Sequence, residues 1–403
     1  MGYDLLSAFA PHEGELIAFR RDIHKHPETA FQETRTAALV AEKLRGWGLA
    51  VHTGLAATGV VATLKGRRVT GDKARDGRSI ALRADMDALN LQEKNDFAHA
   101  SAYAGKMHAC GHDGHTAMLL GAARHLAADP DFAGNLHFIF QPAEEGEGGA
   151  RVMIEEGLFE KFPCDAVYGM HNMPGVPLGH FAIRAGAMMA ASDTWTTVFR
   201  GTGGHGAMPH MGSDPTMAAA AFVTATQQII ARNVSPQHAA VISVGHIAAG
   251  AYGSPNVIPS QVTIRGTARS YTPEDRDLLE RRLHELANGI AAAHGVSVEH
   301  DYLRRYPPLV NAAAQTAIAI RAASALVGAD KVDGDAEKLT GAEDFAFMLE
   351  RKPGAYILIG NGGSVADGSC HYVHTPHYDF NDAILTTGAA YWVELVKQEL
   401  GVA

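Results

Sequence analysis

The sequence predicts an α/β protein in which a mostly parallel sheet domain is interrupted by an inserted α+β domain. Helical and strand patterns alternate along residues 1–187 and again after Pro307-Pro308, as is typical of a parallel sheet with helices on both faces. The intervening residues have the order strand, helix, strand, strand, helix, strand, which is the ferredoxin-like unit. We therefore expect a discontinuous domain of residues 1–187 and 306–403 around an inserted domain of residues 188–305.

The individual elements follow from the spacing of apolar residues, three or four apart in helices and in short branched runs in buried strands. In the discontinuous domain, helices are expected at 13–26, 33–47, 115–128, 149–159 and 389–400, and strands at 60–64, 79–83, 136–140, 166–170 and 356–360. In the inserted domain, strands are expected at 194–200, 240–247, 262–269 and 296–303, and helices at 214–230 and 273–294, the second after a Thr272 N-cap.

Composition and charge exclude several functions. Lys+Arg 34 against Asp+Glu 44 gives a net charge of −10, which opposes nucleic-acid binding and docking on anionic membranes because both need basic surface. Hydrophobic residues make up 46% of the chain, too many for a disordered protein. Three cysteines make no disulfide framework, and neither a secretory signal nor an apolar run of about 18 residues is visible. We expect a cytoplasmic protein without nucleic-acid or membrane partners.

Polar, metal-capable residues follow three of the predicted strands. Asp85 and Asp87 come after one strand, Glu144 and Glu145 after the next, and His171 after a third. Ligands of open α/β sheets bind beyond the carboxyl ends of the strands. One such carboxylate alone is more often a solvated loop residue, but three coincidences favour a functional site.

The segment KMHACGHDGH, residues 106–115, is the strongest local signal. Cys110 and His112 are two apart, so they point the same way in extended chain, and thiolate and imidazole suit zinc and other first-row divalent ions. A lone cysteine is more often a small buried hydrophobe, but three histidines lie within five residues of this one. A cysteine nucleophile with a histidine base is an alternative, which the adjacent pair Glu144-Glu145 disfavours. One of these carboxylates can bind metal while the other takes a proton from water.

Further candidates lie in the last and inserted parts of the chain. Residues 371–377 contain three histidines, and spacing alone leaves open which one is a ligand. The segment 340–345 is expected to start a helix, with Glu343 and Asp344 at its positive end. Arg265 and Arg269 share one face of a predicted strand, where an arginine can hold a carboxylate or form a surface ion pair. His24 is expected to be a packed, structural histidine.

Six short motifs occur in order along nearly the whole chain: RDIHKHPE from Arg21, LRADMDAL from Leu82, HACGHDGH from His108, QPAEE from Gln141, GHGAMPH from Gly204 and VHTP from Val373. Together they resemble the M20 metallopeptidase family. The nearest branch is the amidohydrolases, which include hippurate hydrolase, N-acyl-amino-acid deacylases and plant auxin-conjugate hydrolases. The resemblance implies a zinc-peptidase-like α/β domain with an inserted lid that often dimerises.

The resemblance also implies a role for each candidate residue. Glu144 would be the general base, and Asp87 would lie beside a metal-site histidine. His205 looks like the lid histidine that stabilises the oxyanion, often in a partner subunit, and Asn256 and Arg269 look like the lid residues that hold the substrate's carbonyl and carboxylate. The implied ligands of two divalent ions (Zn, Mn, Co or Ni) are Cys110, His112, Glu145, His171 and His374.

The expected function is metal-dependent hydrolysis of small N-acyl amino acids, such as hippurate-like or N-acetyl compounds, to a carboxylate and a free amino acid. We expect a homodimer or homotetramer formed through the lid. One rival is a dipeptidase or aminopeptidase of the same family, which would need a pocket for a free α-amine. The other is a non-catalytic metal- or ligand-binding protein, which the presence of Glu144 and of every ligand type opposes.

Overall fold

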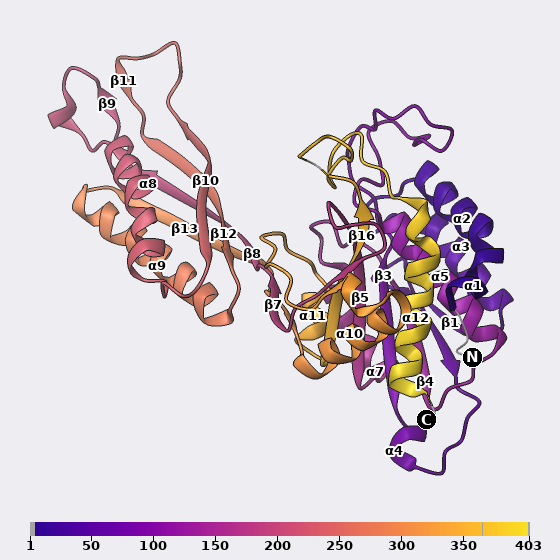
Figure 1. Cartoon of the computed structure of the whole chain (residues 1–403). Helices are drawn as coiled ribbons and strands as arrows, with labels where there is room; N and C mark the ends of the chain where they lie inside the picture. Colours follow the sequence, from indigo (N-terminus) through magenta and orange to yellow (C-terminus); the bar gives the residue numbers. More distant parts are fainter. Residues whose placement is uncertain (1–4, 365, 402–403) are drawn as a thin grey trace. The chain divides into compact units, whose positions relative to one another are not determined.

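The computed structural model describes residues 5–364 and 366–401, and the chain folds into two compact units (Figure 1). The larger unit consists of Met1–Gly186, Val310–Glu337 and Asp344–Ala403, and the smaller unit of Ala187–Leu309 with Lys338–Glu343. Each unit has a hydrophobic core of its own.

The larger unit is built on an eight-stranded sheet that is parallel at its centre, as predicted. Strands β4, β3, β5 and β16 run parallel to one another, and β2 and β1 extend the sheet antiparallel beyond β4. Both β3 and β16 are buried along their whole length, as strands covered on two faces must be. In spatial order the strands are β1 (Ala50–Leu55), β2 (Gly59–Lys65), β4 (Asn135–Gln141), β3 (Ser79–Asp85), β5 (Ala166–Pro174), β16 (Gly354–Gly362), β6 (Phe181–Ala182) and β15 (Val332–Asp333).

The register of the central strands brings their polar ends to one level. Asp85 on β3 pairs with Gln141 on β4, and Arg83 on β3 pairs with Gly169 on β5. His171 follows Gly169 by two residues, so it lies level with Asp85 and on the same face of its strand as Gly169. The carboxyl edge of the sheet therefore gathers residues from three strands.

Helix α5 (His112–Ala128) is the central helix of this unit. Every residue from His112 to Ala123 is buried, and the helix packs on β3, β4 and β5 and against α12 (Leu385–Leu400). It starts three residues before the predicted position, because Gly111 adopts the N-cap position. The unit's other α-helices in the described residues are α1 (Leu5–Phe9), α2 (Glu13–Lys25), α3 (Thr34–Gly46), α4 (Lys73–Asp76), α6 (Gly149–Glu155), α7 (Leu158–Lys161), α10 (Ala313–Val327) and α11 (Ala346–Leu349).

The smaller unit has the ferredoxin-like arrangement that the sequence predicts. Its antiparallel sheet has the order β10, β12, β8, β13, and apolar side chains such as Trp195 and Phe199 pack against Phe222 and Leu279 of its two helices. Thr272 caps the second helix as predicted, since its hydroxyl accepts a hydrogen bond from the Asp275 amide at 3.1 Å. The elements are β8 (Ser192–Arg200), α8 (Pro215–Arg232), β10 (Ala240–Ala249), β12 (Gln261–Ser270), α9 (Pro273–Ala293) and β13 (Ser297–Tyr306).

Short elements complete the fold. Two-stranded pairs are formed by β9 (Gly204–His205) with β11 (Val257–Ile258), and by β7 (Gly186–Met189) with β14 (Leu309–Asn311). Among the helices of residues 5–364 and 366–401, none combines the length and apolar composition that crossing a bilayer requires.

Candidate metal centre

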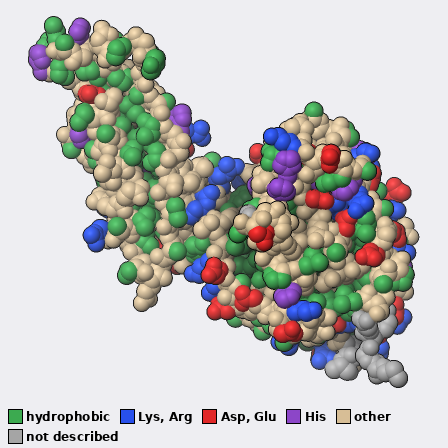
Figure 2. Space-filling model, turned by 45° about the horizontal axis from the view of Figure 1, so that its top comes forward, with side chains coloured by type: hydrophobic (Ala, Val, Ile, Leu, Met, Phe, Trp, Pro, Cys, Tyr) green, Lys and Arg blue, Asp and Glu red, His purple; other side chains and the backbone are tan. Residues whose placement is uncertain are grey.

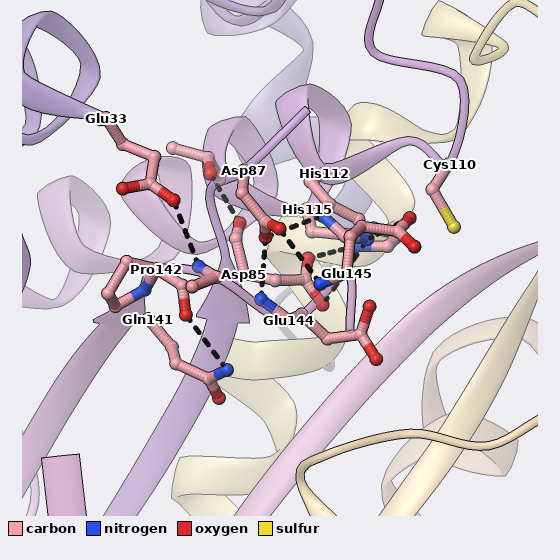
Figure 3. Close-up of polar contacts among 12 residues, drawn as sticks. Glu33, Asp85, Asp87, Cys110, His112, His115, Gln141, Pro142, Glu144 and Glu145 are labelled. Carbon is pink, nitrogen blue, oxygen red and sulfur yellow. Dashed lines mark hydrogen bonds and ion pairs between the residues drawn. The ribbon is translucent and has the colours of Figure 1, made fainter. Parts of the chain in front are cut away.

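Five side chains of the larger unit converge beyond the carboxyl edge of its sheet, and Figure 3 shows three of them, Cys110, His112 and Glu145. They form two groups, Cys110 with His112 and His171, and Cys110 with Glu145 and His374. Within each group the possible ligand atoms lie within 4.8 Å of one another. The Cys110 sulfur belongs to both groups, 3.3 Å from Nε2 of His171 and 3.3 Å from Nε2 of His374. The geometry is that of two adjacent ligand sets that share one atom.

Gly111 allows Cys110 and His112 to enter the same cluster. It has a φ of 96° at the N-cap of α5, a conformation that side chains other than glycine seldom adopt. A Cβ at this position would also lie 2.2 Å from Nδ2 of Asn172 and 2.6 Å from the hydroxyl oxygen of Tyr378. The chain therefore turns sharply between the two side chains while close packing is kept.

Asp87 orients three members of the site. Its Oδ1 accepts hydrogen bonds from the Glu144 amide at 3.0 Å and from Nδ1 of His112 at 3.2 Å, and its Oδ2 accepts one from the Glu145 amide at 2.9 Å. Because Nδ1 of His112 is engaged, Nε2 is the atom presented to the cluster. A carboxylate behind a histidine is the usual way in which metal ligands are oriented.

The neighbouring histidines His171 and His115 differ in which ring nitrogens are hydrogen-bonded within the protein. Nδ1 of His171 donates to the carbonyl of Asn172 at 2.5 Å, which leaves Nε2 facing Cys110. In His115, Nε2 accepts a hydrogen bond from the Asn172 amide at 2.9 Å, and Nδ1 donates to Asp85 at 2.6 Å. Both nitrogens of His115 are engaged within the protein, so this histidine supports the site and is not a candidate ligand.

The chemistry of this donor set fits divalent metal ions. Nε2 of His112 is buried without a hydrogen-bond partner among the described residues, an arrangement that costs free energy unless a cation satisfies the atom. Oε1 of Glu145 is also buried and faces Nε2 of His374 at 3.1 Å, so a carboxylate oxygen and two imidazole nitrogens are directed into the cluster. Burial, together with the carboxylates of Glu145 and Glu144, holds the pKa of the Cys110 thiol well above its usual range. A bound cation reverses that effect and deprotonates a coordinating thiol, and sulfur, imidazole and carboxylate together suit zinc and its first-row neighbours.

Glu144 lies at the margin of the cluster. It is 7% exposed, and its carboxylate lies within 4.8 Å of ligand atoms of His112 and Glu145. The two adjacent glutamates diverge after Ala143, as Figure 3 shows. This position places a second carboxylate beside the candidate ligands, where it can exchange protons with a water molecule.

The candidate residues of the smaller unit lie in two places. His205 on β9 and Asn256, directly before β11, line one cavity of about 590 Å³, because the two short strands pair. Arg269 lies on β12 and is half-buried; its guanidinium donates to the carbonyl of Ala268 at 3.0 Å. Burial lowers the pKa of Arg269, and no salt bridge to it is found in residues 5–364 and 366–401.

Sequence reasoning missed a buried polar network beneath the cluster. Arg83 donates to Asp85 at 2.6 Å and to Asp344 at 3.0 Å, and Gln141 donates to Asp344 at 2.8 Å. Asp344 also accepts the amide of Ala150 at 2.9 Å. The signal that could have revealed it was an arginine inside a buried strand, since a buried charge needs a partner. A helix does start at the end of the segment 340–345, since Phe345 is the N-cap of α11, which begins at Ala346. The Asp344 carboxylate, however, binds this network and the first turn of α6, and not the start of α11.

A mostly parallel sheet with a cluster of cysteine, histidine and carboxylate donors at its carboxyl edge is typical of α/β proteins that bind divalent metal ions. The chain belongs to the family described as peptidase family M20/M25/M40, which matches residues 81–398. The family resemblance seen in the sequence is thereby confirmed, and the chain is a hydrolase that acts on amide bonds.

Relatives of known activity and structure match the chain over nearly its whole length. It is 40% identical over 388 residues to hippurate hydrolase of Campylobacter jejuni, covering 96% of this chain and 97% of that protein. It is 36% identical over 386 residues to N-acetylcysteine deacetylase of Bacillus subtilis, covering 94% and 95%. The crystal structure of a dinuclear metal-binding peptidase of the M20 family from Bacillus subtilis is 34% identical, with a TM-score of 0.81 over 96% of this chain and 98% of that one. The likeness supports divalent metal ions at the site.

Proposed function

We propose that this protein hydrolyses N-acyl amino acids to a carboxylate and a free amino acid. The observation that carries the proposal is the position of Glu144 beside two ligand groups that share Cys110. Two relatives named for their substrates, hippurate hydrolase and N-acetylcysteine deacetylase, both act on an amino acid with an acyl group on its nitrogen. The half-buried Arg269 is suited to the α-carboxylate that such substrates carry.

The five converging side chains would hold two divalent ions. The ligands would be Cys110, His112, Glu145, His171 and His374, with Cys110 common to both groups. When bound, the ions supply Lewis acidity to the amide carbonyl and make a water molecule more acidic.

The chain's own residues move the protons and hold the substrate. The Glu144 carboxylate takes a proton from the attacking water, whose oxygen forms the new bond to the acyl carbon. The oxyanion that develops is stabilised by a hydrogen bond from His205, a contribution of roughly 3–4 kcal/mol for a well-placed donor. Glu144 then gives its proton to the amide nitrogen as the carbon–nitrogen bond breaks. Asn256 would hold the acyl carbonyl and Arg269 the α-carboxylate.

The smaller unit would also serve as the dimerisation surface. Strand β10 lies at the edge of its sheet, and Val241 and Ile247 on this strand are 41% and 56% exposed. Apolar side chains along this unit are visible in Figure 2. An exposed apolar edge strand is a template for pairing with another chain, here a second copy. The variant Ile247→Lys should then lower the mass measured by light scattering to that of the monomer.

The function is tested by amine release from a substrate panel after metal removal and after Mn²⁺ or Zn²⁺ is restored. The panel contains N-acetyl-Met, hippurate, an indoleacetyl amino acid and a plain dipeptide. Metal-dependent release from an acylated substrate is expected. Release from the dipeptide alone would instead assign the protein as a peptidase, as the structural relative from Bacillus subtilis is described.

The variant Glu144→Gln tests the assigned base. It should keep its metal and lose turnover by a factor on the order of 10²–10⁴, which is the usual contribution of a general base. Glu147→Gln, an exposed carboxylate three residues away, is the matched control and should keep full turnover. Unchanged turnover in Glu144→Gln would rule out this residue as the base.

A further inference from the structure

Glu33 is a buried carboxylate that the mechanism does not use. It is 0% exposed and directly precedes α3, but its side chain forms no hydrogen bond with the start of that helix. Its Oε1 accepts hydrogen bonds from the Phe31 amide at 3.1 Å and the Ala143 amide at 3.0 Å, and its Oε2 accepts one from the Thr58 hydroxyl at 2.6 Å. Figure 3 shows it directed at the turn that precedes Glu144.

The residues bound by Glu33 lie in backbone conformations that side chains avoid. Ala143 has a φ of 56° and Phe31 a φ of 58°, and two left-handed residues, Ala56 and Ala57, directly precede Thr58. Each left-handed residue other than glycine costs roughly 1–2 kcal/mol, so it persists only where surrounding contacts hold it. The single carboxylate of Glu33 joins all three turns.

The turn at Ala143 decides where the two functional glutamates point. The amides of residues 143, 144 and 145 are each accepted by a buried carboxylate, the first by Glu33 and the other two by Asp87. The carbonyl of Ala143 accepts the amide of Gly149 at 2.9 Å. A return of Ala143 to an ordinary φ would therefore rotate the peptide planes from which Glu144 and Glu145 project.

We propose that Glu33 is a positioning residue that holds the Ala143 turn, and through it sets the Glu144 carboxylate for proton transfer and the Glu145 carboxylate for metal binding. The inference rests on the proposed function of these two glutamates and extends it to a residue more than 100 positions earlier in the chain. Hydrogen-bond acceptance, and not negative charge, is the property that the role requires.

Replacement by glutamine separates these two properties. In Glu33→Gln the amide oxygen can accept both backbone N–H groups, and the NH₂ group can donate to Thr58, because a hydroxyl both donates and accepts. Burial raises the pKa of Glu33 to about 7, against the opposing hydrogen bond from Thr58, so an uncharged side chain suits the site. In Glu33→Ala the three donors lose their acceptor.

The experiment compares Glu33→Gln and Glu33→Ala with the wild type in kcat, KM and the affinity of chelator-treated protein for Mn²⁺ alone. We expect Glu33→Ala to lose roughly 10–100-fold in kcat and in Mn²⁺ affinity, as for other residues that orient metal ligands, with KM changed far less. Glu33→Gln should stay close to the wild type in all three. Glu28→Ala is the matched control, since Glu28 accepts the amides of Arg35 and Thr36 at 2.9 and 2.8 Å and does not bind the Ala143 turn.

Three outcomes would overturn the proposal: Glu33→Ala with unchanged kcat and Mn²⁺ affinity, Glu33→Gln as impaired as Glu33→Ala, or Glu28→Ala with the same losses. If Glu33→Ala does not fold, Glu33→Asp, which is one methylene too short to reach Ala143, takes its place with the same expectations. Failure of the proposed function is distinguishable, because the substrate panel would then show no metal-dependent release from an acylated substrate, while the Mn²⁺ titrations of the Glu33 variants keep their meaning.

Discussion

Replacing Asp87 by asparagine tests how the proposed metal ligands are oriented, because the change keeps the shape of the side chain and removes one acceptor. The carboxylate accepts the Glu144 amide and Nδ1 of His112 on one oxygen and the Glu145 amide on the other. An asparagine can present its carbonyl oxygen to only one side. Its NH₂ group must then face an N–H donor, either that of Glu145 or those of Glu144 and His112.

The magnitude follows from this geometry. Asp87 is 1% exposed, and a buried donor left without its acceptor costs about 1–3 kcal/mol. If the whole cost destabilises the metal-bound state relative to the metal-free state, the metal affinity falls by about 5- to 150-fold, at 1.4 kcal/mol per tenfold change. The range agrees with the roughly 10–100-fold loss on removing a carboxylate behind a metal-binding histidine.

The assay is calorimetric titration of chelator-treated Asp87→Asn with Mn²⁺, followed by kcat at saturating metal. The control is Asp193→Asn, which makes the same change at another buried carboxylate. Asp193 accepts hydrogen bonds from Arg276 and Tyr302 in the smaller unit. Mn²⁺ affinity within twofold of the wild type would refute the orienting role of Asp87. An equal loss in Asp193→Asn would show that reduced stability, and not ligand geometry, is the cause.

Three further predictions concern packing, pH and substrate. Gly111→Ala should destabilise the protein by about 2–4 kcal/mol from backbone strain and overpacking, measured by urea unfolding, whereas Gly14→Ala, where a Cβ meets nothing within 4 Å, should not. Burial lowers the pKa of His24, but Asp113 and Glu93 outweigh it and raise the value to about 9. The stability from this pairing, on the order of 3 kcal/mol, is full below the unfolded-state pKa of about 6.5 and is lost as pH rises through about 9. His24→Gln should therefore flatten the fall in unfolding free energy between pH 6.5 and 9.5, and an unchanged slope would contradict the assignment. Arg269→Ala should raise KM roughly 10-fold or more for substrates with a free α-carboxylate, as loss of a charge-assisted bond predicts, but not for their α-amides; equal effects on both would contradict carboxylate binding.

Local patterns in the sequence were sufficient for the order and type of the main elements. The strands predicted at 79–83, 136–140 and 166–170 correspond to β3, β4 and β5, starting within one residue of them and ending one to four residues earlier, because strands buried on both faces contain mostly apolar runs. The edge strand β1 was missed. Its burial pattern is mostly exposed, so it carries little apolar signal.

Sequence by itself determined which kinds of donor atom lie beyond the strand ends, and the ordered motifs determined the family. Only the tertiary structure decided which of the neighbouring histidines face the candidate metal site and which are bound to other residues. His115 is bound at both nitrogens, His371 and His377 contact one another, and His374 lies beside Cys110. The same holds for Glu33, whose acceptor role depends on a turn 110 residues away. The physical reason is that the partner of a buried polar atom is set by convergence of distant segments, whereas secondary structure and donor type are set by the local chain.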